Sequence, residues 1–349
     1  MFFSSKFGYN GFMEKQELNK QELTHQQVLE EISQTELGGR ILQTQELTGG
    51  FYGHVYKVTV ETENGNKDWV VKFVENKPEP SFEQEEMDNR VYGARWSNLK
   101  PSYDLLKQHS LPVPELETIK SDGKYNYSVT EFLKGDSLKD LMLKDSTQDI
   151  AQLHSMIGDQ LGKMHAVTRD YFGWVDMRKP YDKNWKDSFF ESCQSHLQQA
   201  SANHKFIKDR EAKIQIFLEQ RKNEWTDPKQ FVFSHTDGVQ GIATMENNQW
   251  QLNGFIDLED NMFTDQRFVL AGHEMILEWS GKSILSEFWE QYQNHIAIDE
   301  TFQQTKSLFK LYYLISWTWA FGEGWRGSEE EKQKAMNILQ KMLDRQLES

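Results

Sequence analysis

Two aspartates in the second half of the chain have the residue type and spacing that phosphoryl transfer requires. Asp237 lies in FVFSHTDGVQGIA, and Asp257 follows twenty residues later in GFIDLEDN. Each comes after a short apolar run, which predicts a carboxylate at or just past the end of a strand. Between them Glu246-Asn247-Asn248 predicts a turn that folds the segment back and brings the carboxylates together. One could accept a hydroxyl proton and the other hold Mg²⁺, as transfer from ATP requires. The alternative is that each is a turn residue or helix cap.

The first part of the chain offers a glycine turn and one lysine as phosphate ligands. Small turn residues would let backbone N–H groups approach phosphate oxygens, although a plain hairpin turn has the same pattern. These are Gly49, Gly50 and Gly53. Lys72 interrupts the apolar strand 70–74, so it faces either a cleft or a solvated sheet surface. A cleft lysine needs a carboxylate partner, and the acidic segment that follows offers Glu86, with Glu85 as its rival.

The elements that must position these residues fall into two regions. Residues 36–133 read as mainly β, with strands near 54–60, 69–74 and 127–133 and a helix at 81–98. Gly135-Asp136 then breaks the pattern, and the periodicity becomes helical. The helices predicted there are 148–166, 185–202, 207–222, 266–279, 284–296, 302–321 and 329–347. We expect an α+β chain with an N-terminal helical extension (1–35), a small antiparallel β lobe (36–133) and a larger, mostly helical lobe (134–349).

Bulk composition narrows the class of partner and the compartment. The chain has 349 residues and a net charge of −15, which argues against nucleic acid and anionic membrane as partners. No apolar run reaches the roughly 18 residues of a membrane span. The single Cys193 excludes a disulfide framework and fits a reducing cytoplasm. We expect a cytoplasmic monomer or homodimer that binds a small molecule.

The order of these parts resembles the aminoglycoside phosphotransferase family, which includes choline and related small-molecule kinases. The motifs follow one another in the order expected of a protein kinase-like fold: a glycine turn, a strand lysine, an acidic helix, a Thr-Glu-Phe-Leu strand, His-x-Asp and Ile-Asp. Further segments that match are 127–138, 161–166, 172–175 and 184–190. The resemblance runs from about Leu47 to about Gly272 and implies a bilobal kinase-like fold and a transferase that uses ATP and Mg²⁺.

Carried over position by position, the resemblance implies a role for each candidate. Asp237 would be the catalytic base, and Asp257 would hold Mg²⁺. His235 would be structural, its ring hydrogen-bonded to backbone near Asp257. Lys72 would bind the α- and β-phosphates beside Glu86, under the backbone of 49–53. Adenine would contact the main chain at Glu131 and Leu133 and the side chains of Val71 and Phe132.

One position departs from the family pattern. Five residues after Asp237 the family has a metal-binding Asn, and this chain has Ile242, which cannot coordinate a cation. Gln240 could supply an amide oxygen from a shifted position, because Mg²⁺ accepts hard oxygen ligands and several waters. The alternative is a nucleotide-binding pseudokinase or small-molecule sensor. The usual Asp before Leu-Ala is Val269, a packing or hydrogen-bond position.

The acceptor is predicted only by class. Carboxylates beside indoles in the helical lobe suit a cationic amine through charge pairing and cation–π contact. The candidates are Glu259, Asp260, Glu274, Glu278, Trp279 and Glu323. An aminoglycoside, a choline-like alcohol and an amino sugar all fit this description. Trp317, His165 and His273 are expected to pack between helices.

Overall fold

The computed structural model describes residues 25–47, 53–63, 65–75, 90–91, 94–121, 124–143, 150–223, 225–236, 238–322 and 328–348. The chain divides into two units, Met1–Pro78 with Pro114–Leu133 and Glu79–Val113 with Lys134–Ser349. The segment Glu79–Val113, which the sequence assigned to the β lobe, therefore belongs to the second unit.

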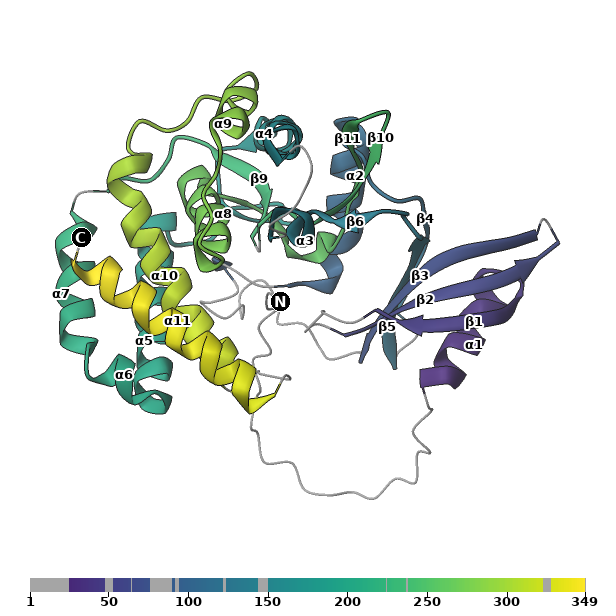
Figure 1. Ribbon diagram of the computed structural model, residues 1–349, viewed down its shortest axis with the longest axis horizontal. Coiled ribbons are helices and arrows are strands. Elements are labelled where there is room, and N and C mark those ends of the chain that lie inside the picture. The colour runs from purple at the N-terminus through teal and green to yellow at the C-terminus, as the bar shows by residue number, and fades with distance from the viewer. Residues whose placement is uncertain are drawn as a thin grey trace. The chain divides into compact units, whose positions relative to one another are not determined.

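The first unit is built on a five-stranded antiparallel sheet in the order β1-β2-β3-β5-β4 (Figure 1). Its strands are β1 (Arg40–Glu46), β2 (His54–Thr62), β3 (Gly65–Glu75), β4 (Leu116–Ser121) and β5 (Tyr125–Glu131). The β2–β3 hairpin closes at Thr62 and Gly65, which has a φ of 105° that favours glycine. The central strand β3 pairs with β2 on one side and β5 on the other.

One face of this sheet is buried under α1 (His25–Glu36). Helical spacing gathers Val28, Leu29 and Ile32 on one side of α1, where they join the core that the strands provide. The strand residues of that core are Val58, Val60, Trp69, Val71, Phe73, Tyr127 and Val129. The predicted N-terminal extension therefore includes a helix that forms part of the first unit's core.

The second unit is mainly helical and contains two small antiparallel sheets, β11-β10-β6 and β7-β9-β12-β8. Its strands are β6 (Asp136–Ser137), β7 (Thr168–Arg169), β8 (Gly173–Trp174), β9 (Phe231–His235), β10 (Gly241–Glu246), β11 (Gln249–Phe255) and β12 (Asn261–Thr264). The helices are α2 (Leu99–Gln108), α3 (Leu138–Leu143), α4 (Ile150–His165), α5 (Trp185–Asn203), α6 (Lys205–Lys208), α7 (Glu211–Lys222), α8 (Gln266–Trp279), α9 (Ser286–Tyr292), α10 (Phe302–Gly322) and α11 (Glu329–Glu348), with 3₁₀ turns η3 (Trp96–Asn98) and η4 (Leu258–Asp260). Helix α10 packs against α5, α8 and α11, and α4 packs against α9.

The helix predicted at 81–98 differs from what the structure contains. Residues 81–89 lie outside the described part, and the helix that is described, α2, begins at Leu99. Pro101 is tolerated because it stands in the first turn, where its missing N–H costs nothing. Leu99, Ser102, Tyr103 and Leu106 form its buried face at helical spacing. No helix was predicted over 99–108 from the sequence.

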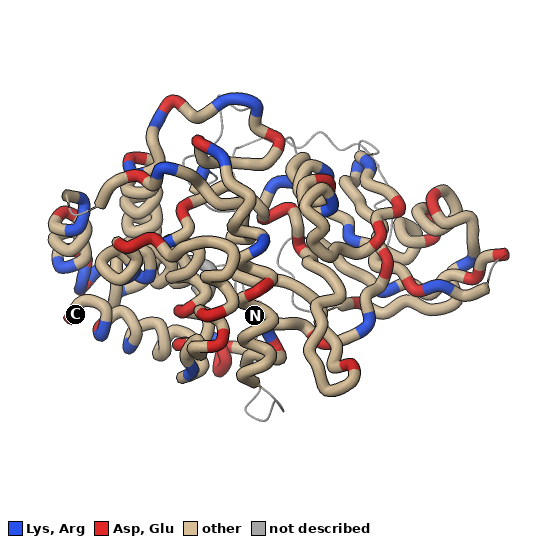
Figure 2. Tube along the Cα trace, turned by 90° about the horizontal axis from the view of Figure 1, so that it is seen from above, with Lys and Arg blue, Asp and Glu red and all other residues tan. Residues whose placement is uncertain are grey.

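Charges of both signs are interspersed along the described chain (Figure 2). None of the described helices is long and apolar enough to cross a membrane. Exposed ion pairs such as Lys100–Asp104 and Lys205–Asp209 place positive charges next to many of the acidic side chains.

Candidate active site

Strand β9, which precedes Asp237, pairs with strand β12, which follows Asp257. Strand β9 lies inside its sheet, between β7 and β12, and all five of its residues are buried. In this register Asn261 lies opposite His235. The loop that leaves β9 and the turn that enters β12 are consequently neighbours.

The chain between β9 and β12 folds back as the sequence predicted. Strands β10 and β11 form a hairpin in which Glu246 pairs with Gln249. Asn247 and Asn248 make its two-residue loop, with φ values of 50° and 60°. Two successive positive φ angles define the type I′ turn that matches the twist of a hairpin, and Asn tolerates them best after Gly. The hairpin returns the chain to Asp257.

Three contacts tie the end of β9 to the Asp257 turn. The ring Nε2 of His235 donates to the carbonyl oxygen of Asp257 over 2.8 Å, the backbone contact that the family resemblance implies for this histidine. The backbone N–H and the hydroxyl of Thr236 both donate to the carbonyl oxygen of Asp260, at 3.4 and 3.2 Å. Asp237 itself is outside the described residues, but Thr236, the residue before it, is held against the turn.

Asp257 adopts a backbone conformation that few residues accept. Its φ and ψ are 56° and 46°, in the left-handed region, where a non-glycine residue costs roughly 1–2 kcal/mol. Its side chain is exposed, whereas Glu259 and Asp260 are buried with 2% and 6% of their surface exposed. Asp260 approaches His235, with Oδ2 3.8 Å from Nε2. Asp257 is therefore the carboxylate of this turn that solvent and ligands can reach.

Gln240 and Ile242, the two positions connected with the expected metal site, contact the segment that leads into Asp257. The carbonyl of Gln240 accepts the N–H of Ile256, the residue before Asp257, over 3.2 Å. Ile242, the second residue of β10, pairs with Gly254 on one side and Ser137 of β6 on the other. A carboxylate in an exposed turn is an oxygen donor of the kind that suits Mg²⁺. Among the described residues there is no group of three or more His, Cys, Asp or Glu that could hold a metal.

Lys139 is a charged neighbour of this turn that the sequence analysis missed. It lies half-buried in α3, two residues after Ser137, which pairs with Ile242. Burial lowers the pKa of Lys139, and the charges of Asp140 and Asp257 act in the opposite direction. Its ammonium is thus close enough to Asp257 for their charges to interact. The preceding Gly-Asp-Ser-Leu segment was noted in the sequence, but nothing in it marked this lysine.

In the first unit, the face of β3 decides which valine accompanies Lys72. Alternation along the strand places Val71 in the core under α1, with 1% of its surface exposed. Val70 and Lys72, both half-buried, share the opposite face. The prediction that Val71 contacts adenine is therefore wrong, because its side chain points into the core. Val70 is the valine on the lysine's face.

The glycine turn and the β5 exit are described only in part. Gly49, Gly50 and Glu86 lie outside the described residues. Gly53 has a φ of 85°, and a Cβ there would lie 2.7 Å from the carbonyl oxygen of Phe73, so close approach to β3 requires glycine. The N–H groups of Glu131 and Phe132 donate to the carbonyls of Glu115 and Asp68, at 2.8 and 3.2 Å. The Lys57 ammonium lies 4.2 Å from the centre of the Phe132 ring. The next residue, Leu133, is half-buried.

The three predicted acceptor residues on α8 all take part in helix packing. Lys310 of α10 pairs with Glu274 at 2.7 Å and with Glu278 at 2.6 Å. Trp279 stacks on Phe321, with ring centroids 5.0 Å apart and an interplanar angle of 5°. These side chains hold α8 against α10, which the sequence could not reveal because Lys310 is far along the chain. Glu323 is outside the described residues.

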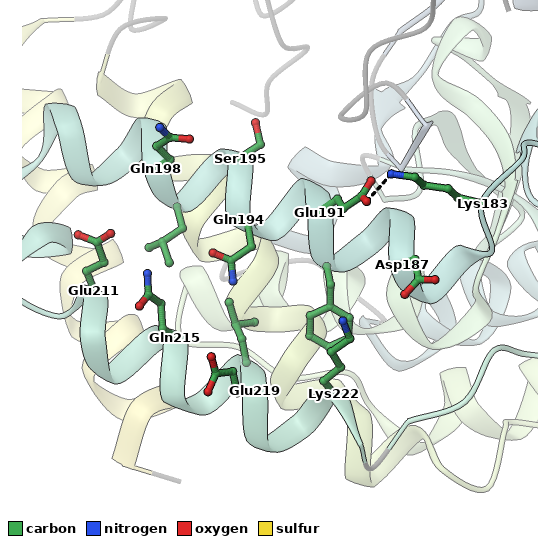
Figure 3. Close-up of a pocket in the computed structure, with 13 residues that line it drawn as sticks. Lys183, Asp187, Glu191, Gln194, Ser195, Gln198, Glu211, Gln215, Glu219 and Lys222 are labelled. Carbon is green, nitrogen blue, oxygen red and sulfur yellow. Dashed lines mark hydrogen bonds and ion pairs between the residues drawn. The ribbon is translucent and has the colours of Figure 1, made fainter. Parts of the chain in front are cut away.

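A recess of about 970 Å³ lies on another part of the second unit, between α5 and α7 (Figure 3). Its polar lining includes Gln194, Gln198, Gln215 and Glu219, and Lys183 pairs with Glu191 at its edge. None of the site residues predicted from the sequence lines this recess. The recess is therefore separate from the Asp257 turn.

Comparison with solved structures identifies the fold. A putative fructosamine-3-kinase from Haemophilus somnus 129PT is 15% identical, with a TM-score of 0.52 over 89% of this chain and 96% of that one. Spectinomycin phosphotransferase APH(9)-Ia, solved with ADP and spectinomycin, is 13% identical, with a TM-score of 0.55 over 92% and 95%. At these identities the likeness establishes a protein kinase-like α+β fold. A search of curated proteins found no match.

The sequence itself shows the family. The profile of the phosphotransferase enzyme family matches residues 43–299, which is more than half of the chain. The match includes the β3 lysine strand, the His235 segment and the Asp257 turn. The chain belongs to the phosphotransferase enzyme family.

Proposed function

We propose that the protein is an ATP-dependent O-phosphotransferase that acts on a small hydroxylated acceptor. The observation that carries the proposal is the pairing of β9 with β12 in a chain of this family. It ties the peptide before Asp237 to the turn that presents Asp257. A proton-accepting carboxylate and a metal-binding carboxylate on adjoining segments are the groups that transfer of a phosphoryl group requires.

In this proposal Asp237 orients the acceptor hydroxyl and accepts its proton. The acceptor oxygen forms a bond to the γ-phosphorus while the bond from that phosphorus to the bridging oxygen breaks, and ADP leaves. Asp257 and Gln240 would hold Mg²⁺, which when bound neutralises phosphate charge. The protein's contribution is positioning and electrostatic stabilisation.

The nucleotide would be bound largely by the first unit. Lys72 would pair with the α- and β-phosphates, and Val70 would cover adenine from the same face of β3. The other groups assigned to the nucleotide are Gly49, Gly50, Gly53, Glu86 and the main chain at Glu131 and Leu133. The ring of Phe132, already under Lys57, would border the adenine.

Lys139 is proposed as a second positive charge near the phosphates. Ile242 removes the amide ligand that the family has at this position, so the site would hold less metal-ion charge against the phosphates. The Lys139 ammonium stands near Asp257 and follows the strand that pairs with Ile242. It can supply part of the missing charge without a second metal.

A cationic acceptor is the class we propose, such as an aminoglycoside, a choline-like alcohol or an amino sugar. The net charge of −15 favours a cation. Two similar structures support the class, since one is a phosphotransferase bound to ADP and spectinomycin and the other is a ternary complex of APH(2")-IIa with streptomycin and ATP. Of the carboxylates first suggested, Glu274 and Glu278 pair with Lys310, and Glu259 and Asp260 are buried. Glu323, which lies outside the described residues, is the remaining candidate from that set.

The test is acceptor-dependent formation of ADP. Purified protein is incubated with ATP, Mg²⁺ or Mn²⁺ and a panel of aminoglycosides, amino sugars and amino alcohols. We expect turnover with at least one acceptor, and its loss in Asp237→Asn but not in the control Glu246→Gln, which changes an exposed hairpin residue. Nucleotide binding is measured separately, because a ligand at about 100 times its Kd raises the unfolding free energy by about 2.7 kcal/mol.

A nucleotide-binding pseudokinase is the second candidate, and Ile242 is the observation that favours it. It predicts a thermal shift with ATP and Mg²⁺ but no ADP from any acceptor. Absence of both turnover and a nucleotide-dependent shift would overturn both functions.

A further inference from the structure

Tyr313 of α10 reaches the segment that leads into the candidate catalytic loop. Its hydroxyl donates to the carbonyl oxygen of Thr236 over 3.3 Å. Thr236 directly precedes Asp237, and 1% of its surface is exposed. The N–H and the hydroxyl of Thr236 both donate hydrogen bonds to the carbonyl oxygen of Asp260. All three polar groups of Thr236 are therefore hydrogen-bonded. The phenol of Tyr313 is hydrogen-bonded to the carbonyl, which belongs to the peptide that joins Thr236 to Asp237.

The phenol is held in place by α8. The ring of Tyr313 stacks on Phe268 with centroids 4.7 Å apart and an interplanar angle of 12°. A Cβ on Gly272 would lie 2.6 Å from the Tyr313 hydroxyl oxygen, so this close passage requires glycine. Phe268 and Gly272 lie one helical turn apart and form the surface on which the ring rests. Tyr313 is itself 2% exposed, so its orientation is set by packing.

We propose that Tyr313 is a positioning residue for Asp237, an inference that rests on the proposed phosphotransferase function. The hydrogen bond to the Thr236 carbonyl orients the peptide group that joins Thr236 to Asp237. Rotation of this peptide would turn the carboxylate away from the acceptor hydroxyl. Because a displacement of about 1 Å in a reacting group can lower a rate by about 100-fold, one buried hydrogen bond at this peptide can control turnover.

The adjacent Tyr312 provides a matched control on the same helix. It is also buried, at 0% exposed, and its hydroxyl contacts Ser192 Oγ and His196 Nε2, each at 3.2 Å. Neither partner belongs to the β9 segment. Tyr312→Phe and Tyr313→Phe therefore each remove one buried hydroxyl from α10, and only the second removes a contact to Thr236.

The experiment compares the two variants by kinetics and by hydrogen exchange. We expect Tyr313→Phe to lower kcat by about 10- to 100-fold, with KM for ATP within about twofold of wild type. Tyr312→Phe should keep kcat within about twofold, even where it lowers Tm equally. Gly272→Ala keeps the phenol but displaces it, and should reproduce the effect of Tyr313→Phe on kcat.

Amide exchange of the peptide that contains Thr236 decides the inference apart from activity. It should accelerate in Tyr313→Phe and stay at the wild-type rate in Tyr312→Phe. If the wild-type protein has no turnover, the proposed function fails while exchange still tests the contact. Equal exchange in both variants, or losses of kcat that simply follow Tm in both, would overturn the positioning role.

Discussion

The imidazole of His235 holds the carbonyl of Asp257, 2.8 Å away, and so connects the strand before one candidate aspartate to the backbone of the other. Asp257 has left-handed dihedral angles, and a hydrogen bond to its own carbonyl helps to fix that conformation. The same ring nitrogen lies 3.8 Å from Asp260 Oδ2. His235 is thus oriented toward the turn, where it acts as a structural link and shapes how Asp257 is presented.

Restoring the missing amide is the most direct test of the metal site. In Ile242→Asn we expect the Mg²⁺ concentration for half-maximal turnover to fall by about tenfold, or about 1.4 kcal/mol in metal binding, because an added oxygen ligand replaces a water. A magnesium titration of ADP formation, or of the nucleotide-dependent thermal shift, measures this. Ile242→Val keeps a β-branched apolar side chain in the strand and serves as the control. Identical magnesium dependence in the two variants would exclude a metal at this position.

The features that sequence predicted correctly depend on local pattern. The Asn247-Asn248 turn follows from two residues that tolerate positive φ between apolar runs. Helices α5 and α8 follow from periodicity, and each begins after a residue whose side chain caps it, Asn184 and Asp265. The contact of His235 with the Asp257 backbone was predicted through the family resemblance, since nothing local specifies it.

The features that sequence missed depend on partners remote in the chain. Glu278 is a plausible ligand until Lys310, on another helix, is seen to pair with it. From sequence alone either Val70 or Val71 could contact adenine, and only the packing of α1 on one face of the sheet distinguishes them. Lys139 gains significance only because β6 pairs with β10. In each case tertiary packing, which no local periodicity reports, assigns the role.

The opposite faces of β3 give a prediction that separates stability from nucleotide binding. Val71→Ala removes buried methyl groups and should lower the unfolding free energy by about 2 kcal/mol while the nucleotide-dependent thermal shift remains. Val70→Phe adds bulk on the lysine's face and should abolish that shift with little effect on stability. Chemical denaturation and thermal shift with ATP and Mg²⁺ measure the two effects. A nucleotide shift that survives in Val70→Phe and disappears in Val71→Ala would show that the faces are assigned wrongly.

His273 predicts a specific dependence of stability on pH. Burial, with a further contribution from the charge of His154, lowers its pKa to about 3, against an ordinary value of 6.5. Between these values the unfolded chain binds the proton that the folded chain excludes, so this histidine's contribution to stability is complete above pH 6.5. It is lost as pH falls, at about 1.4 kcal/mol per pH unit.

His273→Phe should remove this dependence. The ring stacks on Phe288 at 5.2 Å, and neither of its nitrogens has a hydrogen-bond partner among the described residues. Phenylalanine can therefore replace it at little cost at pH 7. Urea denaturation at several pH values below 6 should give a curve flatter than wild type by about 1.4 kcal/mol per pH unit. A slope equal to that of wild type would mean that His273 protonates in the folded state.

The pair of Arg267 and Asp265 at the start of α8 should be the charged interaction that is most costly to break. Arg267 is 2% exposed and donates to Asp265 at 2.6 Å, to Thr301 at 2.7 Å and to the carbonyl of Thr226 at 2.9 Å. Arg267→Met leaves the Asp265 carboxylate buried beside an apolar chain, and we expect a loss of about 3–5 kcal/mol in unfolding free energy. The control is Arg210→Met, whose pair with Asp344 is partly exposed and should contribute about 1 kcal/mol or less. Adding Asp265→Asn to Arg267→Met should recover part of the loss, because it removes the unpaired charge. Equal losses for Arg267→Met and Arg210→Met, or a double variant no more stable than Arg267→Met, would contradict the assignment.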